Sequence, residues 1–343
     1  MVDVEDRLLL DSPAAILHHY RKPGTPPQPP VLVVAPLSGH FGWLMRDLVL
    51  GLAPRHDVHL LEWQDARDIP AAAGRFGLDR SIGCIMDALR RLPRRATVVA
   101  VSQAPTAALA AAALMAADAE PMRPRALVLM GGFIDTRINP TPMARMAGAL
   151  PAGWFSRILA TRTAGGQAGD GRLVYPGRYH WQALARYLSR HLATGGELAG
   201  KLADDDGADP DAFPFLRLFS TLMDLPAEFA EDNSELVFRR HALARGQLTW
   251  AGQPVEPAAL EDVALMTVEG GRDDSSGFGQ TLAAHALSHR IPDGLREHHI
   301  EPEAGHFGLF HGRPWFESIL PEVEAFIARV ARSRRAPRHR QKV

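Results

Sequence analysis

A serine stands at the junction between an apolar run and an alanine-rich segment, where its hydroxyl could act as a nucleophile. Residues 98–101 predict a strand, Ser102 follows directly, and a helix is expected to begin near Pro105. A serine on such a strand-to-helix turn is a nucleophile elbow, usually written G-x-S-x-G. Ala100 and Ala104 occupy the two glycine positions here. The same serine could instead be an ordinary helix N-cap, so the interpretation depends on the other candidate groups.

An acid and a base follow later in the chain, in an order that completes a triad. Asp273 lies in the loop after the apolar run 264–268, and His306 lies among small residues after the short run 297–300. Serine, acid and histidine come in this order in α/β-hydrolases. Neutral histidine can accept the serine proton, and a carboxylate holds the imidazole in one tautomer. We therefore predict Ser102 as nucleophile, Asp273 as acid and His306 as base.

Two other carboxylates are alternatives for the acid. Asp274 is the neighbour of Asp273 and is hard to separate from it by sequence. Asp135 follows the apolar run 126–130, which is the other place where this fold can carry its acid. We favour Asp273 because it is closer to the end of its predicted strand.

The oxyanion of an acyl-transfer reaction would be stabilised by backbone N–H groups. One is expected from Gln103, the residue after the nucleophile, and the other from Leu37 or Ser38, in the turn after the buried strand predicted at 31–35. Ser38 and His40 are also candidate pocket residues. Backbone donors leave no signature in side-chain types, so this assignment depends on the fold.

Strands alternate with helices along the first 130 residues, which predicts a doubly wound, mostly parallel sheet. A helix is expected from Asp79, as its cap, to about Leu92. After Gly132 the pattern becomes helical and irregular until strand-like sequence returns at 264–268. We predict an α/β-hydrolase fold with an inserted helical cap, divided into core (1–132), cap (133–246), core (247–331) and a basic, disordered tail (332–343).

Composition limits the function classes. The chain has 343 residues with 46% hydrophobic content, enough for a sizeable core. Its 38 basic and 39 acidic residues give no reason to expect a nucleic-acid partner. No secretory signal or membrane-length apolar run is visible, so we expect a cytoplasmic protein. The one cysteine, Cys84, is expected in the core, and neither a metal nor an organic cofactor is expected.

Six separate segments form a further pattern along the chain: 36–40, 65–67, 74–76, 130–140, 223–229 and 268–274. In this order they resemble the intracellular polyhydroxybutyrate depolymerases, and more distantly the polyhydroxyalkanoate synthases. The likeness extends from about Leu8 to Arg329. It implies hydrolysis, or thiolysis with coenzyme A, of the amorphous polyester in cytoplasmic storage granules. It maps the nucleophile, acid and base onto Ser102, Asp273 and His306.

One departure from this family concerns the nucleophile. Its intracellular members commonly carry a Cys-Gln pair, whereas this chain has Ser102-Gln103. Serine favours water as the acceptor and argues against synthase-type chain growth. We predict an ester hydrolase acting on poly(3-hydroxybutyrate) or its oligomers, with the polyester granule surface as a partner. The alternatives are a general carboxylesterase or thioesterase for small acyl substrates, and a non-catalytic granule-surface protein.

Overall fold

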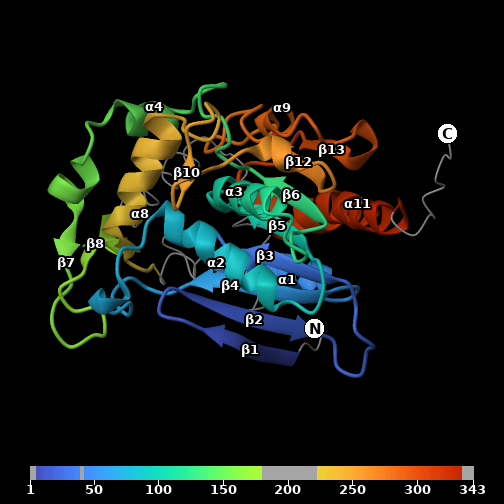
Figure 1. Ribbon diagram of the computed structural model, residues 1–343, viewed down its shortest axis with the longest axis horizontal. Coiled ribbons are helices and arrows are strands. Elements are labelled where there is room, and N and C mark those ends of the chain that lie inside the picture. Colours follow the sequence, from blue (N-terminus) through green and yellow to red (C-terminus); the bar gives the residue numbers. More distant parts are fainter. Residues whose placement is uncertain (1–4, 39–41, 180–221, 334–343) are drawn as a thin grey trace.

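An eight-stranded sheet forms the centre of the protein (Figure 1). The structure, a computed structural model, describes residues 5–38, 42–179 and 222–333. In the sheet, β2 runs antiparallel to both of its neighbours, and all other neighbouring strands pair in parallel. The doubly wound, mostly parallel sheet is therefore confirmed. Its strands, in spatial order, are β1 (Glu5–Asp11), β2 (Ala15–Arg21), β4 (Asp57–Trp63), β3 (Pro30–Val34), β5 (Thr97–Val101), β6 (Ala126–Met130), β12 (Ala264–Gly270) and β13 (Arg296–Glu301).

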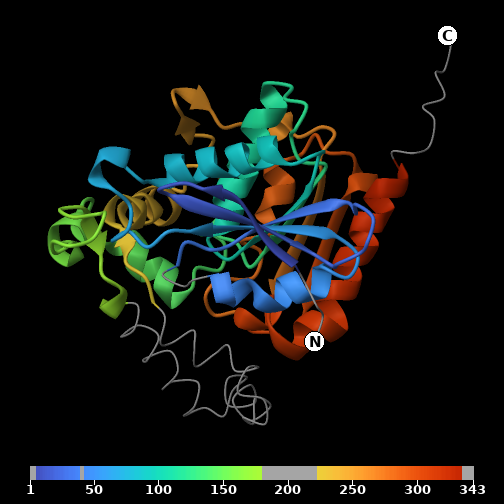
Figure 2. The ribbon, with the colours of Figure 1, turned by 90° about the horizontal axis from the view of Figure 1, so that it is seen from below.

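Helices cover both faces of the sheet (Figure 2). The helices α1 (Arg46–Leu52) and α11 (Leu320–Ser333) lie on one face, and α2 (Leu78–Arg91) and α3 (Ala104–Ala117) lie on the other. The central strands β3, β5 and β6 are consequently buried at every position. Burial on both faces is why these strands are continuous apolar runs rather than alternating ones.

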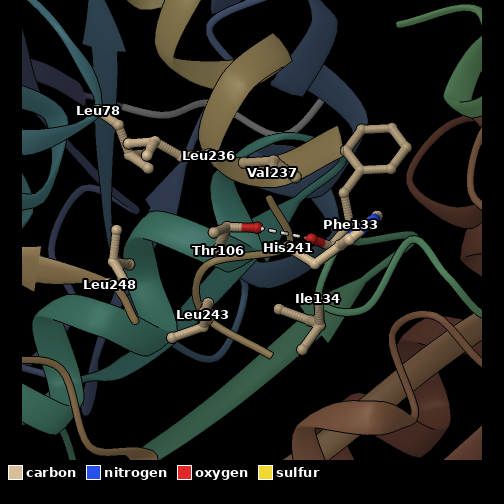
Figure 3. A pocket seen from close by; sticks show the side chains of 9 residues that line it. All are labelled: Leu78, Thr106, Phe133, Ile134, Leu236, Val237, His241, Leu243 and Leu248. Carbon is tan, nitrogen blue, oxygen red and sulfur yellow. Dashed lines mark hydrogen bonds between the residues drawn. The ribbon is translucent and has the colours of Figure 1, made fainter. Parts of the chain in front are cut away.

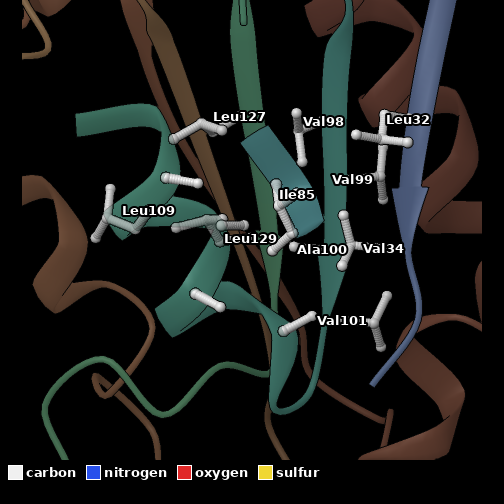
Figure 4. Close-up of a cluster of buried hydrophobic side chains, with 14 of the residues drawn as sticks. Leu32, Val34, Ile85, Val98, Val99, Ala100, Val101, Leu109, Leu127 and Leu129 are labelled. Carbon is white, nitrogen blue, oxygen red and sulfur yellow. The ribbon is translucent and has the colours of Figure 1, made fainter. Parts of the chain in front are cut away.

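The alanine-rich helix α3 packs closely against β5 and lies beside α2, whose Ile85 also reaches the sheet (Figure 4). It is buried from Ala104 to Met115, because its small side chains let the helix backbone approach the strands. Cys84 of α2 belongs to the same core and is buried, as expected. Burial raises the pKa of its thiol to about 11, so the thiol stays protonated at neutral pH.

The start of α2 corrects one prediction. The N-cap residue is Gly77 rather than Asp79, and no side chain of the local sequence caps the helix. Instead, the Leu78 N–H donates to the carboxylate of Asp232, 154 positions later, at 2.9 Å. Asp79 lies inside the first turn and pairs with Arg75 at 2.6 Å. The capping group therefore comes from a distant segment that the local pattern does not reveal.

Between β6 and β12 the chain forms a separate set of short elements, at the left of Figure 1. This region includes the whole predicted cap, whose boundaries stay a prediction; residues 180–221 of it lie outside the described part. At the C-terminus, α11 continues through Ser333, the second residue of the predicted tail, and residues 334–343 also lie outside it. The elements of the insertion are α4 (Pro142–Ala149), a π-helical turn (Phe155–Leu159), β7 (Thr161–Arg162), β8 (Leu173–Tyr175), β9 (Leu225–Pro226), α8 (Ala227–Asp232), a second π-helical turn (Asn233–Arg239), β10 (Thr249–Trp250), β11 (Gln253–Pro254) and a 3₁₀ turn (Pro257–Ala259).

Short helical turns complete the chain around the core. They connect the longer elements and include the segment that follows β13. They are the 3₁₀ turns Gly42–Met45, Ala71–Ala73, Asp293–Leu295 and Phe307–Leu309, the helices α9 (Ala283–Leu287) and α10 (Gly312–Pro314), and the π-helical turn Trp315–Ile319.

Candidate active site

Ser102 occupies a strained turn between β5 and α3. Its φ is +61°, in the left-handed region that side chains with a Cβ rarely adopt. The turn is held by the Ser102 N–H, which donates to the Met130 carbonyl at 2.9 Å. Ala100 and Ala104 on either side are buried, which explains why only small residues fit there. The N-cap of α3 is Gln103, so the alternative of Ser102 as an ordinary N-cap is wrong.

A continuous hydrogen-bonded chain links Ser102, His306 and Asp273. The His306 Nε2 lies 2.8 Å from the Ser102 Oγ, and its Nδ1 lies 2.8 Å from the Asp273 Oδ2. The His306 and Asp273 side chains are only 6% and 2% exposed. An ionised carboxylate can only accept, so Nδ1 carries the proton and Nε2 is left to accept from the serine hydroxyl. This is the geometry that a general base needs.

The sheet order brings these three residues together. Ser102 follows β5, Asp273 follows β12 and His306 follows β13, so all three leave the carboxyl edge of the sheet. The strand β6 lies between β5 and β12, and its continuation at Gly131 occupies the space between the two loops. Gly131 has φ +56°, and a Cβ there would lie 3.2 Å from the His306 Cε1 and 3.3 Å from the Asp273 Oδ2. A glycine is therefore needed beside the histidine and its acid.

The two alternative acids are placed differently. Asp135 accepts two hydrogen bonds from the Arg137 guanidinium, at 2.8 and 2.7 Å. Burial favours the neutral form of Asp135, but the hydrogen bonds from Arg137 outweigh it and hold the pKa of the carboxyl below its ordinary value. Asp274 is the next residue of the turn and is half-buried. Asp273 forms the hydrogen bond to the His306 Nδ1, which agrees with the prediction of Asp273 as the acid.

The two backbone N–H groups expected to stabilise the oxyanion, those of Leu37 and Gln103, follow two neighbouring strands. Val34 of β3 pairs with Ala100 of β5, and Leu37 and Gln103 each follow three residues later. Gln103 is the N-cap of α3, and the N–H groups at this end of the helix have no partner within the helix and carry its partial positive charge. Leu37 is buried.

The candidate pocket residues Ser38 and His40 follow Leu37 in the same turn. Ser38 is half-buried. His40 lies outside the described residues, so its place relative to the triad stays a prediction.

A buried glutamate that sequence analysis did not identify folds the loop that carries Asp273. Glu269 of β12 is 3% exposed. Its carboxylate accepts backbone N–H groups from Gly279 at 2.9 Å, Thr281 at 2.7 Å and Leu282 at 3.0 Å. Glu269 thus joins the two ends of the loop that carries Asp273, which we call the acid loop. Sequence analysis found no signal for this role of Glu269, because the backbone N–H groups that it binds are 10 to 13 positions away.

A second carboxylate that sequence analysis did not identify, Asp47 of α1, binds the segment that follows His306. Its carboxylate accepts the Gly312 N–H at 2.8 Å and pairs with His311, five residues after His306. The Trp315 indole donates to the Asp47 carbonyl at 2.9 Å. Burial raises the pKa of the carboxyl, but the bonds from His311 and Gly312 outweigh it, and the pKa lies below its usual value. The segment after His306 is thereby fixed to the helix that follows β3.

A small apolar cavity lies between the core and the insertion, lined by side chains that do not include the triad (Figure 3). It has room for about one water molecule. The Thr106 hydroxyl at its wall donates to the Phe133 carbonyl at 3.0 Å. The cavity is a packing gap rather than a substrate site. Its lining residues are Leu78, Thr106, Phe133, Ile134, Leu236, Val237, His241, Leu243 and Leu248.

Neither a metal cluster nor a membrane helix is found in the part of the chain that the structure describes. Among residues 5–38, 42–179 and 222–333, no three His, Cys, Asp or Glu side chains gather as they would around a metal ion. Over the same ranges, no helix has the length and hydropathy needed to cross a membrane.

Solved structures with the same fold cover almost the whole chain. A thermophilic esterase from Thermogutta terrifontis has 13% sequence identity and a TM-score of 0.52, over 96% of this chain and 99% of that one. A 2-hydroxy-6-oxo-6-phenylhexa-2,4-dienoate hydrolase from Rhodococcus sp. strain RHA1 has 11% identity and a TM-score of 0.53, over 96% and 100%. At these identities the likeness shows the α/β-hydrolase fold alone. No curated protein sequence matches the chain.

A family model shows which α/β-hydrolases this chain belongs with. The model described as "PHB de-polymerase C-terminus" matches residues 131–331. This match covers more than half of the chain and includes Asp273 and His306. The chain therefore belongs to the PHB depolymerase family, built on the α/β-hydrolase fold.

Proposed function

We propose that this protein is a serine hydrolase that cleaves the ester bonds of poly(3-hydroxybutyrate) or its oligomers through an acyl-enzyme. The hydrogen-bonded chain from Ser102 through His306 to Asp273, with the serine on a left-handed turn, is the observation that carries the proposal. Membership of the PHB depolymerase family supports a polyester substrate.

Acylation uses the proton that His306 can accept. The His306 Nε2 removes the Ser102 hydroxyl proton while the Oγ forms a bond to the ester carbonyl carbon. The carbonyl oxygen becomes an oxyanion, which the backbone N–H groups of Gln103 and Leu37 stabilise. The tetrahedral intermediate then breaks its bond to the leaving alkoxy oxygen, which takes the proton from Nε2. The products are an acyl-Ser102 ester and a shortened chain with a free hydroxyl.

Deacylation repeats these steps with water. The neutral His306 accepts a proton from water while the water oxygen attacks the acyl carbon, and the Ser102 Oγ leaves with that proton. A free 3-hydroxyacid end is released. Asp273 stabilises the imidazolium that forms in each half-reaction. We propose water rather than a thiol as the acceptor, with no metal or organic cofactor, and a cytoplasmic location where amorphous polyester is stored.

Clearing of amorphous poly(3-hydroxybutyrate) granules by the purified protein, with titration of the released acid, tests this function. The wild type should clear the suspension, and Ser102→Ala should be slower by several orders of magnitude. Cleavage of p-nitrophenyl butyrate without any clearing would indicate a hydrolase of small esters. Adsorption to granules without hydrolysis of either substrate would indicate a non-catalytic granule protein.

A further inference from the structure

Helix α4 carries its larger apolar side chains on the outside. Ala144 and Ala147 are buried, and the Ala147 carbonyl accepts the Ser234 hydroxyl from the second π-helical turn at 3.3 Å. Met143 and Met146, three residues apart and therefore on one face, are 38% and 63% exposed. A helix of a soluble domain normally buries its long apolar side chains and exposes the small ones. This inversion indicates a face that contacts something other than the core.

Two further exposed apolar residues lie on the segments that join at the N-terminus of this helix. Ile138 and Phe278 are 36% and 46% exposed. They are neighbours, because the Asn139 amide donates to the Phe278 carbonyl at 2.8 Å, and a Cβ on Gly279 would lie 2.9 Å from the Ile138 Cγ2. We call Ile138, Met143, Met146 and Phe278 the rim patch. Exposed apolar side chains that gather in this way mark interaction surfaces.

The rim patch is continuous with the loop that carries Asp273. Phe278 lies on that loop, five residues after the acid. The Thr141 hydroxyl, at the N-cap of α4, donates to the Ser275 carbonyl of this loop at 3.2 Å. Both segments leave the carboxyl edge of the sheet, after β6 and β12, where Ser102 and His306 also lie. Material bound to the rim patch is therefore held at the reactive edge of the molecule.

The chemistry of the patch fits a neutral, apolar surface. Its four side chains carry no charge, and the adjacent Arg137 is neutralised by its pair with Asp135, at 2.7 Å. Arg145 is the single basic residue of α4; it is exposed, and its guanidinium donates to the Pro140 carbonyl. An anionic membrane surface would call for basic side chains facing the headgroups. Methionine side chains are flexible and adapt to irregular apolar partners. An amorphous polyester, with its methyl groups and uncharged ester carbonyls, is such a partner.

We propose that the rim patch is the surface by which this protein adsorbs to amorphous polyester particles, so that their chains are presented to Ser102. This inference rests on the proposed function, since it takes the polyester as substrate. It adds a docking surface outside the triad, made by α4 and the acid loop together.

The test compares a double variant of the patch with a matched control. Met146→Ser with Phe278→Ser removes two of its exposed side chains. Leu8→Ser removes a similarly exposed side chain, 52% exposed, on the edge strand β1 at the other end of the sheet order. Co-sedimentation with amorphous poly(3-hydroxybutyrate) granules measures binding, and p-nitrophenyl butyrate hydrolysis measures whether the site is intact. Zwitterionic lipid vesicles and light scattering test the two other occupants, a bilayer and a second copy of the chain.

We expect the double variant to bind granules at least tenfold more weakly than wild type while hydrolysing the soluble ester at the wild-type rate, and Leu8→Ser to match wild type in both. Equal granule binding by the double variant and wild type would overturn the proposal. The proposal would also be overturned if Leu8→Ser weakened granule binding as much as the double variant does. The same holds if the double variant lost binding to lipid vesicles but kept binding to granules, or if light scattering showed a dimer in the wild type that the double variant does not form. If the double variant loses soluble-ester activity, Met146→Leu with Phe278→Leu should retain both properties, and weak granule binding by this folded pair would also overturn the proposal. Co-sedimentation measures binding independently of hydrolysis. If the wild type bound granules through the rim patch but released no acid, the proposed function would be refuted and the docking proposal would stand.

Discussion

Adding one methyl group at Gly131 should slow catalysis, whereas the same change at a left-handed glycine far from the site should only destabilise the fold. Two costs are separable at this position. The backbone has φ +56°, and an L-residue with a Cβ in the left-handed region costs about 1–2 kcal/mol. The new Cβ would also lie 2.9 Å from the Leu309 Cδ1, 3.2 Å from the His306 Cε1 and 3.3 Å from the Asp273 Oδ2. The leucine end is flexible, but the imidazole and carboxylate must each shift by a few tenths of an ångström.

A second glycine isolates the backbone cost. Gly246 has φ +65°, and a Cβ there would meet no atom within 4 Å. Gly246→Ala therefore imposes the same type of backbone strain without touching the triad. Urea unfolding of the two variants should show similar losses, of about 1–2 kcal/mol. A displacement of about 1 Å in a catalytic group can cost 100-fold in rate, so the smaller shift at His306 predicts a roughly tenfold lower kcat for Gly131→Ala.

The assay is steady-state hydrolysis of p-nitrophenyl butyrate at neutral pH by wild type, Gly131→Ala and Gly246→Ala. We expect only Gly131→Ala to lose kcat, with its KM within twofold of wild type, because the histidine rather than the substrate is displaced. A Gly131→Ala enzyme with wild-type kcat would refute the role assigned to this glycine. Equal losses of kcat in both variants would trace the effect to backbone strain.

Three further variants test other parts of the site and fold. Ser102→Gly should abolish hydrolysis yet be about 1 kcal/mol more stable to urea than Ser102→Ala, since glycine relieves the left-handed strain; equal stability would contradict the strain. Glu269→Gln should cost about 2–3 kcal/mol, because an amide cannot accept all three N–H groups, and should speed hydrogen exchange at Thr281; unchanged exchange would contradict this role. Burial lowers the pKa of His59 to about 4 from 6.5, so the folded state binds fewer protons than the unfolded state and stability should fall, by about 3 kcal/mol, as the pH drops from 6.5 to 4. His59→Asn should flatten that fall in urea titrations at several pH values, and an unchanged slope would show that other groups cause it.

Local pattern was sufficient for the central strands of the sheet, after which the three residues predicted as a triad follow. Buried parallel strands are continuous apolar runs, so β3, β5, β6 and β12 were predicted to within one or two residues at each end. In a doubly wound sheet the carboxyl ends of parallel strands share one edge, so residues following different strands could be expected to meet. The hydrogen bonds of His306 are the consequence of that topology.

Contacts between distant segments explain what the sequence did not reveal. Asp232 caps α2 across 154 positions, and Asp47 bonds Gly312 across 265. No periodicity or motif connects residues so far apart, because each partner looks like an ordinary surface carboxylate in its own segment. The left-handed turn at Ser102 is an intermediate case. The small residues around it indicated a tight turn, but its φ is fixed by the packing of β5 against β6 and α3.

The two carboxylates at the end of β12 show why residue type alone does not assign a role. Glu269 and Asp273 are four residues apart, and both side chains are buried. Glu269 receives backbone N–H groups only from its own loop, so its charge is used to fold that loop. Asp273 receives the N–H groups of Ser275 and Ser276 on one oxygen, at 2.8 Å each, which leaves the other oxygen directed at His306. Glu269 thus sets the shape of the loop, and that shape lets Asp273 orient the His306 imidazole.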